Sequence, residues 1–298
     1  MPAAPRQIGL LTALHKPQAV ECTRELAASL QAAGVRVLVD PRLAEAGLPQ
    51  VTVLSEEQWA RESDLVIVLG GDGTLLAASH ACAPHGTPLL GVDLGGMGFL
   101  AEEQFDRVRE ALGRLLAGDY GLEERLMLQA TVREGERTLA SFVGLNDAVV
   151  AQTEPIRLVN LQAWVGEELV TTYPADGLIL ATPTGSTAYN LSAGGPLVDP
   201  QVDCFILSPI CPHSLDARPL VVPITRPVRL ALGENAGRHP HVSLTVDGQR
   251  HVPLQEGQEV LLAAAPRRAL LVRLGQHSFY GRLRKKLHWG AQRASGGE

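Results

Sequence analysis

The sequence predicts an α/β protein whose N-terminal domain is a doubly wound parallel sheet and whose second domain is mostly antiparallel and β-rich. Up to about residue 120, apolar runs typical of buried strands alternate with helical patterns, which favours a parallel sheet with right-handed crossovers. From Leu126 onward, apolar and polar residues alternate with a period of two, as in antiparallel strands with one buried face. The 298 residues give room for both domains.

The first elements follow from periodicity. Residues 7–14 are expected to form a strand and residues 18–33 a helix that ends at Gly34, because its small and apolar residues share one stripe. Residues 35–39 form a second strand, and residues 41–63 a less regular stretch. The apolar run 8–14 is too short to cross a membrane and lacks a cleavage-like site, so it is a first strand rather than a signal peptide.

A strand at residues 65–69 and a helix from Leu75 are joined by Gly70-Gly71-Asp72-Gly73-Thr74. Three glycines allow a close approach of the backbone to a ligand, and Thr74 can cap the helix whose first amides then face an anion. The junction therefore predicts a phosphate site. Asp72 would repel phosphate, so its carboxylate is expected to address a hydroxyl or a metal instead. A simple Asx-type turn would also explain Asp-Gly.

Residues 88–93 predict a further strand, followed by the glycine-rich residues 94–100. These glycines do not match the dinucleotide fingerprint Gly-x-Gly-x-x-Gly, so the stretch is either a tight turn or a second wall of the site. Residues 105–117 predict a helix.

Strands are expected to dominate from Leu126 to about Leu274, and residues 279–289 return to a helical pattern. The basic residues of that last helix, Arg282, Arg284, Lys285 and Lys286, are expected on a solvated face. We place the first domain at residues 1–120, with a C-terminal helix in 278–298 packing back on it. The β-rich domain is placed at residues 121–277.

Composition excludes several functional classes. With 26 Lys and Arg against 32 Asp and Glu, the formal charge of −6 argues against a nucleic-acid binder. No apolar run approaches the length of a membrane span. Four dispersed cysteines without metal spacing fit a reduced, cytoplasmic chain. No Gly-Lys pair exists, so a Walker-type phosphate loop is excluded.

A second constellation lies at residues 176–195, where a short strand enters a loop crowded with hydroxyls and glycines. A helix is expected to begin at Ser186 or Thr187. Hydroxyls together with helix N-terminal amides suit a ribose or a phosphate, and Tyr189 offers a flat face for a base ring. The alternative is an N-capped helix with a buried tyrosine.

These two loops, together with Leu145-Asn146-Asp147, residues 208–219 and Val246-Asp247-Gly248-Gln249, closely resemble the NAD kinase family. The resemblance covers nearly the whole chain. Gly-Gly-Asp-Gly-Thr is shared with diacylglycerol and sphingosine kinases, whereas residues 182–195 and Asn146-Asp147 are more specific. The resemblance implies transfer of the ATP γ-phosphoryl group to the 2′-hydroxyl of the adenosine ribose of NAD, giving NADP, with Mg²⁺. It also implies an NAD site formed by both domains and a homodimer or homotetramer.

Carried over by position, the resemblance makes Asp72 the general base and an NAD contact, with Gly73 beside it. The backbone of Gly70, Gly71, Gly73 and Thr74 forms the phosphate loop. Further NAD contacts are implied at Asn146, Asp147, Asp176, Thr187, Ala188, Tyr189, Asn190, Leu191 and Ser192, and with weaker local matching at Arg157 and Gln249. The sequence assigns no metal ligands. It departs from the family at Asp93, where Asn is commoner, at Gly96, and at Pro174-Ala175.

Two alternatives stay open on the residues. A lipid kinase with the same glycine loop would need an apolar acceptor cleft and a membrane. A non-catalytic NAD(P) sensor would not need Asp72 at the centre of the loop. We expect small-molecule substrates, no nucleic-acid partner and no membrane association.

Overall fold

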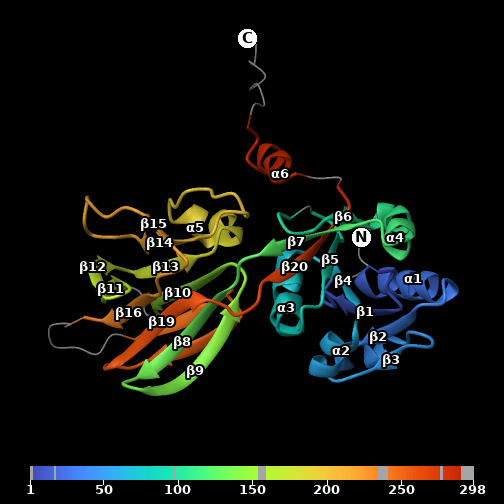
Figure 1. The fold of residues 1–298 in the computed structure, drawn as a ribbon, viewed down its shortest axis with the longest axis horizontal. Helices are drawn as coiled ribbons and strands as arrows, with labels where there is room; N and C mark the ends of the chain where they lie inside the picture. The colour runs from blue at the N-terminus through green and yellow to red at the C-terminus, as the bar shows by residue number, and fades with distance from the viewer. Residues whose placement is uncertain are drawn as a thin grey trace, which may run out of the picture. The chain divides into compact units, whose positions relative to one another are not determined.

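A computed structural model of the chain describes residues 3–16, 18–96, 98–153, 159–233, 241–275 and 278–289. The chain forms two compact units (Figure 1). Unit 1 contains Met1–Leu75, Thr87–Glu123 and Leu271–Glu298, and unit 2 contains Leu76–Gly86 and Glu124–Leu270. The expected fold class is confirmed, because the first sheet is mostly parallel and the sheets of unit 2 are antiparallel.

The sheet of unit 1 has the strand order β3-β2-β1-β4-β5-β20-β7, and β6 pairs with β5. Its strands are β1 (Gln7–Thr12), β2 (Arg36–Val39), β3 (Thr52–Val53), β4 (Leu65–Gly70), β5 (Leu89–Asp93), β6 (Glu103–Gln104), β7 (Gly121–Arg125) and β20 (Ala269–Arg273). β4 is buried along its whole length, as its unbroken apolar run predicts. The strand order reverses between β1 and β4. Ligands bind at such switch points, beyond the carboxyl ends of the strands.

Helices cover both faces of this sheet. α1 (Ala19–Ala32) and α4 (Val108–Leu116) pack on one face against apolar side chains of β1, β4 and β5. On the other face, Gly9 and Gly91 leave room for Trp59 and Leu75, whose side chains lie where a Cβ would otherwise project. Those two residues belong to α2 (Glu56–Glu62) and α3 (Asp72–Cys82).

The irregular stretch expected at residues 41–63 is more regular than its sequence indicates. It holds the short helix η1 (Pro41–Ala46), strand β3 and α2, which begins with a capping box between Ser55 and Gln58. α2 has only two buried residues, Trp59 and Ala60, so its apolar periodicity is too short to read. The expected helix at 105–117 is divided into η3 (Phe105–Arg107) and α4.

Two six-stranded antiparallel sheets make up unit 2, with the orders β15-β14-β13-β10-β17-β18 and β12-β11-β16-β19-β8-β9. Their inward side chains form one apolar cluster that includes Leu128, Val150, Leu161 and Leu180. The strands are β8 (Leu128–Glu134), β9 (Arg137–Gly144), β10 (Asp147–Gln152), β11 (Val159–Val165), β12 (Glu168–Ala175), β13 (Gly177–Ala181), β14 (Cys204–Ile210), β15 (Leu220–Pro223), β16 (Val228–Leu232), β17 (Val242–Val246), β18 (Arg250–Leu254) and β19 (Gln258–Ala264).

The remaining elements are η2 (Ala83–His85), η4 (Thr184–Thr187), α5 (Tyr189–Ser192) and the C-terminal helix α6 (Phe279–Lys286). On α6, Arg284, Lys285 and Lys286 are exposed as expected. The expectation is wrong for Arg282, whose side chain is buried beside a carboxylate.

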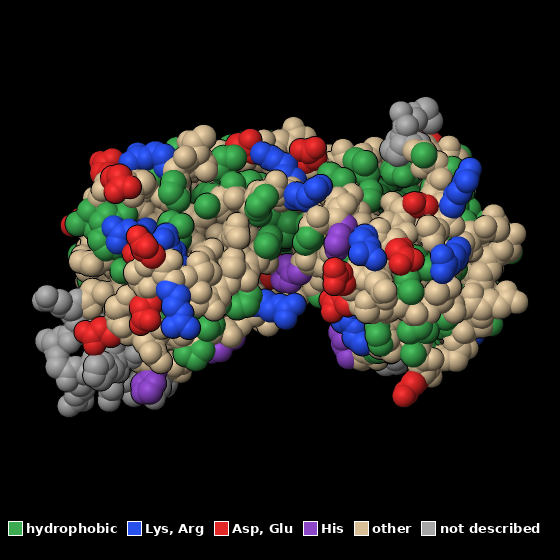
Figure 2. All heavy atoms as spheres, turned by 60° about the horizontal axis from the view of Figure 1, so that its bottom comes forward, with side chains coloured by type: hydrophobic (Ala, Val, Ile, Leu, Met, Phe, Trp, Pro, Cys, Tyr) green, Lys and Arg blue, Asp and Glu red, His purple; other side chains and the backbone are tan. Residues whose placement is uncertain are grey.

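Basic and acidic side chains are interspersed on the face that Figure 2 shows, which suits a chain with a formal charge of only −6. Over the described part of the chain, no helix combines the length and the hydropathy needed to span a bilayer.

Candidate active site

The glycine loop of unit 1 passes directly from β4 into α3, whose first residue is Asp72. The expected cap at Thr74 is therefore wrong, because Thr74 already lies inside the first turn. Its side chain instead fills the space beside Gly70, where a Cβ would lie 2.5 Å from Thr74 Oγ1. Apart from chain neighbours and the backbone of α3, nothing lies within 4 Å of the positions that a Cβ would take at Gly71 and Gly73, so no side chain fills the space beside them.

The Asp72 carboxylate is held by a second glycine-rich loop of the same unit. Its Oδ2 accepts a hydrogen bond from the Phe99 amide at 2.9 Å, and its Oδ1 accepts one from the Leu100 amide at 3.1 Å. A Cβ at Gly98 would lie 1.9 Å from Asp72 Oδ1, so only glycine fits there. Residues 98–100 therefore lie directly against Asp72, and their role as a wall of a substrate site stays a prediction. The second lone pair on each carboxylate oxygen remains available to a hydroxyl.

Asp93 closes the preceding turn in a similar way. Its two oxygens accept hydrogen bonds from the amides of Gly95 and Gly96 at 3.2 and 2.7 Å. Gln18, next to α1, donates to the Leu94 carbonyl at 2.7 Å and ties this turn to the segment that follows β1. The turn is thus fixed at the carboxyl end of the sheet.

In unit 2, Asn146 and Asp147 stand where β10 begins, opposite the end of β13. The Thr182 amide donates to the Asn146 carbonyl at 2.8 Å, and the Thr182 hydroxyl donates to the Leu145 carbonyl at 2.6 Å. A Cβ at Gly185 would lie 2.1 Å from the Asn146 carbonyl oxygen. The hydroxyl-rich loop is therefore packed directly on the Asn146-Asp147 segment.

Asp247 organises this segment. It lies in the β17–β18 turn with φ +50°, beside Gly248 with φ +67°, and the Gln249 amide closes the turn on the Val246 carbonyl. The buried carboxylate of Asp247 accepts hydrogen bonds from the amides of Leu145, Asn146 and Asp147 at 2.7 to 3.0 Å. On α3, the Nε2 atom of His80 lies 2.7 Å from Asp247 Oδ2.

Asp147 is also buried, and its environment opposes ionisation. Desolvation, together with the nearby charge of Asp247, raises the pKa of Asp147 to about 7. Near neutral pH this carboxyl is therefore divided between a form that only accepts hydrogen bonds and a protonated form that can also donate one.

The hydroxyl-rich loop forms two short turns instead of the single helix expected from Ser186 or Thr187. η4 ends at Thr187, Ala188 has φ −98° and ψ −132°, and α5 begins at Tyr189. Non-helical dihedrals at Ala188 break the helix. Tyr189 is 46% exposed, so the interpretation as a buried core tyrosine is wrong.

Asn190 has a different environment from its neighbour. It is fully buried and donates to the carbonyls of Ser186 and Pro196 at 3.3 and 3.1 Å. Its Oδ1 accepts from the Ser208 hydroxyl at 2.7 Å. The side chain therefore holds the shape of the loop.

A cavity of about 400 Å³ in unit 2 brings several of the expected NAD contacts together. It is lined by Asn146, Asp147, Val149, Ala188, Tyr189, Thr245, Asp247 and Gly248. Asp176 does not line it and instead accepts a hydrogen bond from Gln152 at 2.7 Å. Gln249 is exposed just beyond the lining turn, whereas Arg157 lies outside the described residues.

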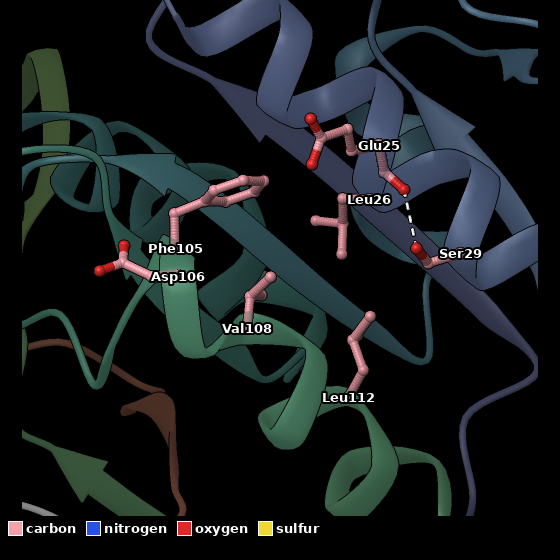
Figure 3. Close-up of a pocket in the computed structure, with 7 residues that line it drawn as sticks. All are labelled: Glu25, Leu26, Ser29, Phe105, Asp106, Val108 and Leu112. Atoms are coloured by element: carbon pink, nitrogen blue, oxygen red, sulfur yellow. Dashed lines mark hydrogen bonds between the residues drawn. The ribbon is translucent and has the colours of Figure 1, made fainter.

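Unit 1 has a separate cavity of about 220 Å³ between α1 and α4 (Figure 3). Its apolar floor is formed by Leu26, Val108 and Leu112, with Glu25 and Asp106 at its edges. None of the site residues expected from the sequence lines this cavity.

Comparison with known families gives two matches that together span most of the chain. The family model described as ATP-NAD kinase N-terminal domain matches residues 8–120, and the one described as ATP-NAD kinase C-terminal domain matches residues 145–274. The chain belongs to the NAD kinase family.

Individual relatives agree with this membership. The NAD kinase of Moorella thermoacetica is 44% identical over 97% of this chain and 91% of its own length. The NAD kinase of Symbiobacterium thermophilum is 46% identical over 91% of this chain and 95% of its own.

Two solved structures share the fold. Yeast NADH kinase complexed with NADH has a TM-score of 0.88 at 26% identity, covering 96% of this chain and 88% of its own. An NAD kinase from Archaeoglobus fulgidus in complex with ATP has a TM-score of 0.73 at 21% identity, covering 95% and 98%. The second comparison concerns the fold alone.

Membership in the NAD kinase family assigns to the chain the ATP-dependent phosphorylation of NAD, a transfer to a hydroxyl group. The family resemblance stated from the sequence is thereby confirmed. Nothing in the comparisons favours a lipid kinase or a non-catalytic sensor.

Sequence reasoning missed three parts of the site: the amides of Phe99 and Leu100, the carboxylate of Asp247, and His80. Asp247 had a readable signal, since Asp-Gly between two alternating runs is typical of a tight hairpin. His80 had none beyond its position two turns after Asp72 on the same helix.

Proposed function

We propose that Asp72 is the general base of NAD phosphorylation in this chain. In the reaction, the 2′-hydroxyl oxygen of the adenosine ribose forms a bond to the γ-phosphorus of ATP while the bond to the β,γ-bridging oxygen breaks. The hydroxyl proton passes to Asp72, and ADP leaves. The observation that carries this role is a carboxylate oriented by two backbone amides at the start of a helix, with no side chain filling the space beside Gly71.

We further propose that the 400 Å³ cavity of unit 2 binds part of NAD. Asn146 and Asp147 offer hydrogen-bonding groups for a ribose or a base edge, and Tyr189 offers an exposed ring for stacking. Thr187, Ala188, Leu191, Ser192 and Gln249 remain proposed contacts around it, and Asn190 acts by holding the loop. Asp176 and Arg157 stay proposals that rest on the family resemblance.

The triphosphate is proposed to lie against the backbone of Gly70, Gly71, Gly73 and Thr74, with a divalent cation, Mg²⁺, as cofactor. Among the described residues, no group of three or more His, Cys, Asp or Glu side chains could hold a metal by itself. Mg²⁺ commonly keeps several of its waters and binds through substrate phosphates, so it needs few protein ligands. When bound, the cation would neutralise phosphate charge.

Residues 1–120 with 278–298 are proposed as the phosphate-binding domain, and residues 121–277 as the NAD-binding domain. A cytoplasmic location is supported by four free cysteines. A homodimer or homotetramer is supported by exposed apolar side chains. Leu215 is 91% exposed, and Leu220 and Val221 are exposed on the edge strand β15. Light scattering on the purified protein would measure the assembly.

The decisive experiment compares NAD with its analogue lacking the adenosine 2′-hydroxyl. Purified protein with Mg-ATP should convert NAD to NADP and leave the deoxy analogue unphosphorylated, as measured by ³¹P NMR of the products. Diacylglycerol in mixed micelles serves as the lipid control and should remain unchanged. Phosphorylation of the deoxy analogue would show that another hydroxyl is the acceptor, and phosphorylation of the lipid would restore the rival activity.

A further inference from the structure

The C-terminal helix α6 carries one buried basic side chain, Arg282, that contacts the loop holding Asp72. Arg282 is 4% exposed, unlike the exposed basic residues that follow it. Its Nη1 donates to the Phe99 carbonyl at 2.7 Å, and its Nη2 donates to Glu102 Oε2 at 2.7 Å. All three residues belong to unit 1.

Phe99 is therefore fixed on both sides of its peptide unit. Its amide donates to Asp72 Oδ2, while its carbonyl accepts from Arg282. On α6, the Nζ atom of Lys286 lies 6.0 Å from the centre of the Phe99 ring, at the outer limit of a cation–π contact. Any shift of Arg282 would act on the same residue that orients the Asp72 carboxylate.

Glu102 completes the clamp. It is 1% exposed and also accepts hydrogen bonds from Arg273 Nη1 at 3.0 Å and from the Leu274 amide at 2.9 Å. Glu102, which lies two residues after the 98–100 loop, thus connects that loop to the end of β20 and to α6. Both ends of that loop are held, one by Asp93 and the other by Glu102.

A buried ion cluster of this kind is a poor source of stability alone. Burial of Arg282 and the nearby charge of Arg273 lower the pKa of Arg282, which expresses the cost of placing its charge there. Well-packed apolar residues commonly stabilise a core as well as a buried ion pair does. What the guanidinium adds is two directed hydrogen bonds in a fixed geometry.

We propose that Arg282 is a positioning residue for Asp72: by holding the Phe99 carbonyl and Glu102, it fixes the two amides that orient the Asp72 carboxylate. The inference rests on the proposed role of Asp72 as general base. Removal of Arg282 leaves the substrate contacts in place but allows the Asp72 carboxylate to move away from its productive orientation. The rate of the chemical step should therefore fall more than the affinity for substrate.

The test compares Arg282→Met, which keeps length and packing but removes the donors, with Arg282→Lys and with Arg284→Met. Arg284 is the matched control because it lies on the same helix and is exposed. Arg282→Met should lower kcat about 10- to 100-fold, with KM for NAD within about threefold of wild type. Arg282→Lys should recover part of the loss, and Arg284→Met should match wild type. A wild-type kcat in Arg282→Met, or a loss confined to KM, would overturn the proposal.

A double-mutant cycle separates positioning from general destabilisation. In an Asp72→Asn background, Arg282→Met should change kcat by less than about twofold, because the base on which it acts is already absent. If Arg282→Met lowers kcat by the same factor in the Asp72→Asn background as in wild type, the inference is overturned. Should Arg282→Met unfold below the assay temperature, Arg282→Lys decides the same cycle.

Hydrogen exchange gives a readout that needs no activity. The amides of Phe99 and Leu100 should exchange faster in Arg282→Met than in wild type or in Arg284→Met, without any substrate present. Unchanged exchange would overturn the positioning role even if the enzyme lost activity. An inactive wild-type protein with the expected exchange pattern would instead count against the proposed function and leave the clamp standing.

Discussion

The proposed role of Asp72 as general base requires a carboxylate that is held in place and can still accept a proton. Two amides fix its plane, and each of its oxygens keeps a second lone pair. Asparagine has the same shape but presents only one acceptor to the two amides, so its NH₂ group faces a donor. Asp72→Asn therefore removes the proposed base and also disturbs one hydrogen bond.

We expect Asp72→Asn to lower kcat by about two to four orders of magnitude. The lost hydrogen bond should cost about 1–2 kcal/mol of unfolding free energy. Asp64→Asn is a matched control, because the Asp64 carboxylate also accepts two backbone amides, those of Arg6 and Gln7 at 2.8 and 2.9 Å, and holds no part of the loop around Asp72. Steady-state kinetics and urea unfolding of both variants check this. Near-normal turnover in Asp72→Asn at saturating NAD would show that another group takes the proton.

Asp147 should make the stability of the protein depend on pH. Because the pKa of Asp147 is raised from 3.8 to about 7, the folded protein keeps a proton between about pH 4 and pH 7 that the unfolded chain releases. Its contribution to stability is therefore largest at low pH, falls as pH rises to about 7, and is constant above that. Asn at this position removes the titration.

The measurement is urea unfolding of wild type and Asp147→Asn at pH 5 and pH 8. Relative to Asp147→Asn, wild type should lose about 2 kcal/mol of unfolding free energy between these two pH values. The comparison cancels the other titrating groups, which the two proteins share. An equal difference at both pH values would mean that the Asp147 carboxyl titrates in its ordinary range.

Among the elements, the β17–β18 hairpin positions Asp247, whose carboxylate accepts hydrogen bonds from three successive amides of the Leu145–Asp147 segment. His80 of α3 supplies the fourth hydrogen bond. Removing that bond should loosen the segment that lines the proposed NAD cavity without touching the Asp72 loop, whose contacts are made by Phe99 and Leu100.

We expect His80→Leu to raise KM for NAD about fivefold to tenfold, which corresponds to the loss of about one hydrogen bond, with a smaller effect on kcat. His80→Gln should lie closer to wild type, because its side-chain amide can donate to Asp247. His85→Leu controls for the loss of an imidazole, since His85 is exposed in η2. Identical KM values for His80→Leu and wild type would remove His80 from the binding machinery.

Elements with long, consistent patterns could be predicted from the sequence, and those set by local geometry could not. β4 and α1 have clear apolar periodicity, and the structure confirms both within a few residues. The start of α3 was misplaced because Asp72 and Gly73 are weak helix formers, and packing of Asp72 against residues 98–100 overrides that preference. The division of η4 from α5 depends on the non-helical dihedral angles of one residue, Ala188. Alanine is a strong helix former, so its presence gives no sign of a break.

At the scale of the whole molecule, fold class and family were accessible because they rest on many residues read together. The contacts that shape the site were not, since they join segments 27 residues apart for Asp72 and Phe99, and 101 residues apart for Asn146 and Asp247. The same holds for Arg282, which reads as part of an exposed basic helix until its partner Glu102, 180 residues away, is known. The sequence pointed to Asp72 and Asn146, whereas their hydrogen-bond partners depend on tertiary packing.

The charge of the whole chain sets the last prediction. The formal charge is −6, and the chain has only three lysines. Lys16 follows the carboxyl end of β1 in unit 1, and the Nζ atom of Lys286 in α6 lies 6.0 Å from the centre of the Phe99 ring. ATP carries about four negative charges, which exceed what loop amides and two lysines balance, so we expect a divalent cation to carry most of the compensation.

EDTA should therefore abolish phosphorylation of NAD, and excess Mg²⁺ should restore it, as followed by NADP formation. Lys16→Ala in the presence of Mg²⁺ should lower kcat/KM for ATP only about threefold to tenfold, because a half-exposed lysine adds about 1 kcal/mol to phosphate binding. Lys285→Ala is the matched control on the exposed face of α6. Full activity in EDTA, or a complete loss of activity in Lys16→Ala with Mg²⁺ present, would show that the triphosphate charge is balanced in another way.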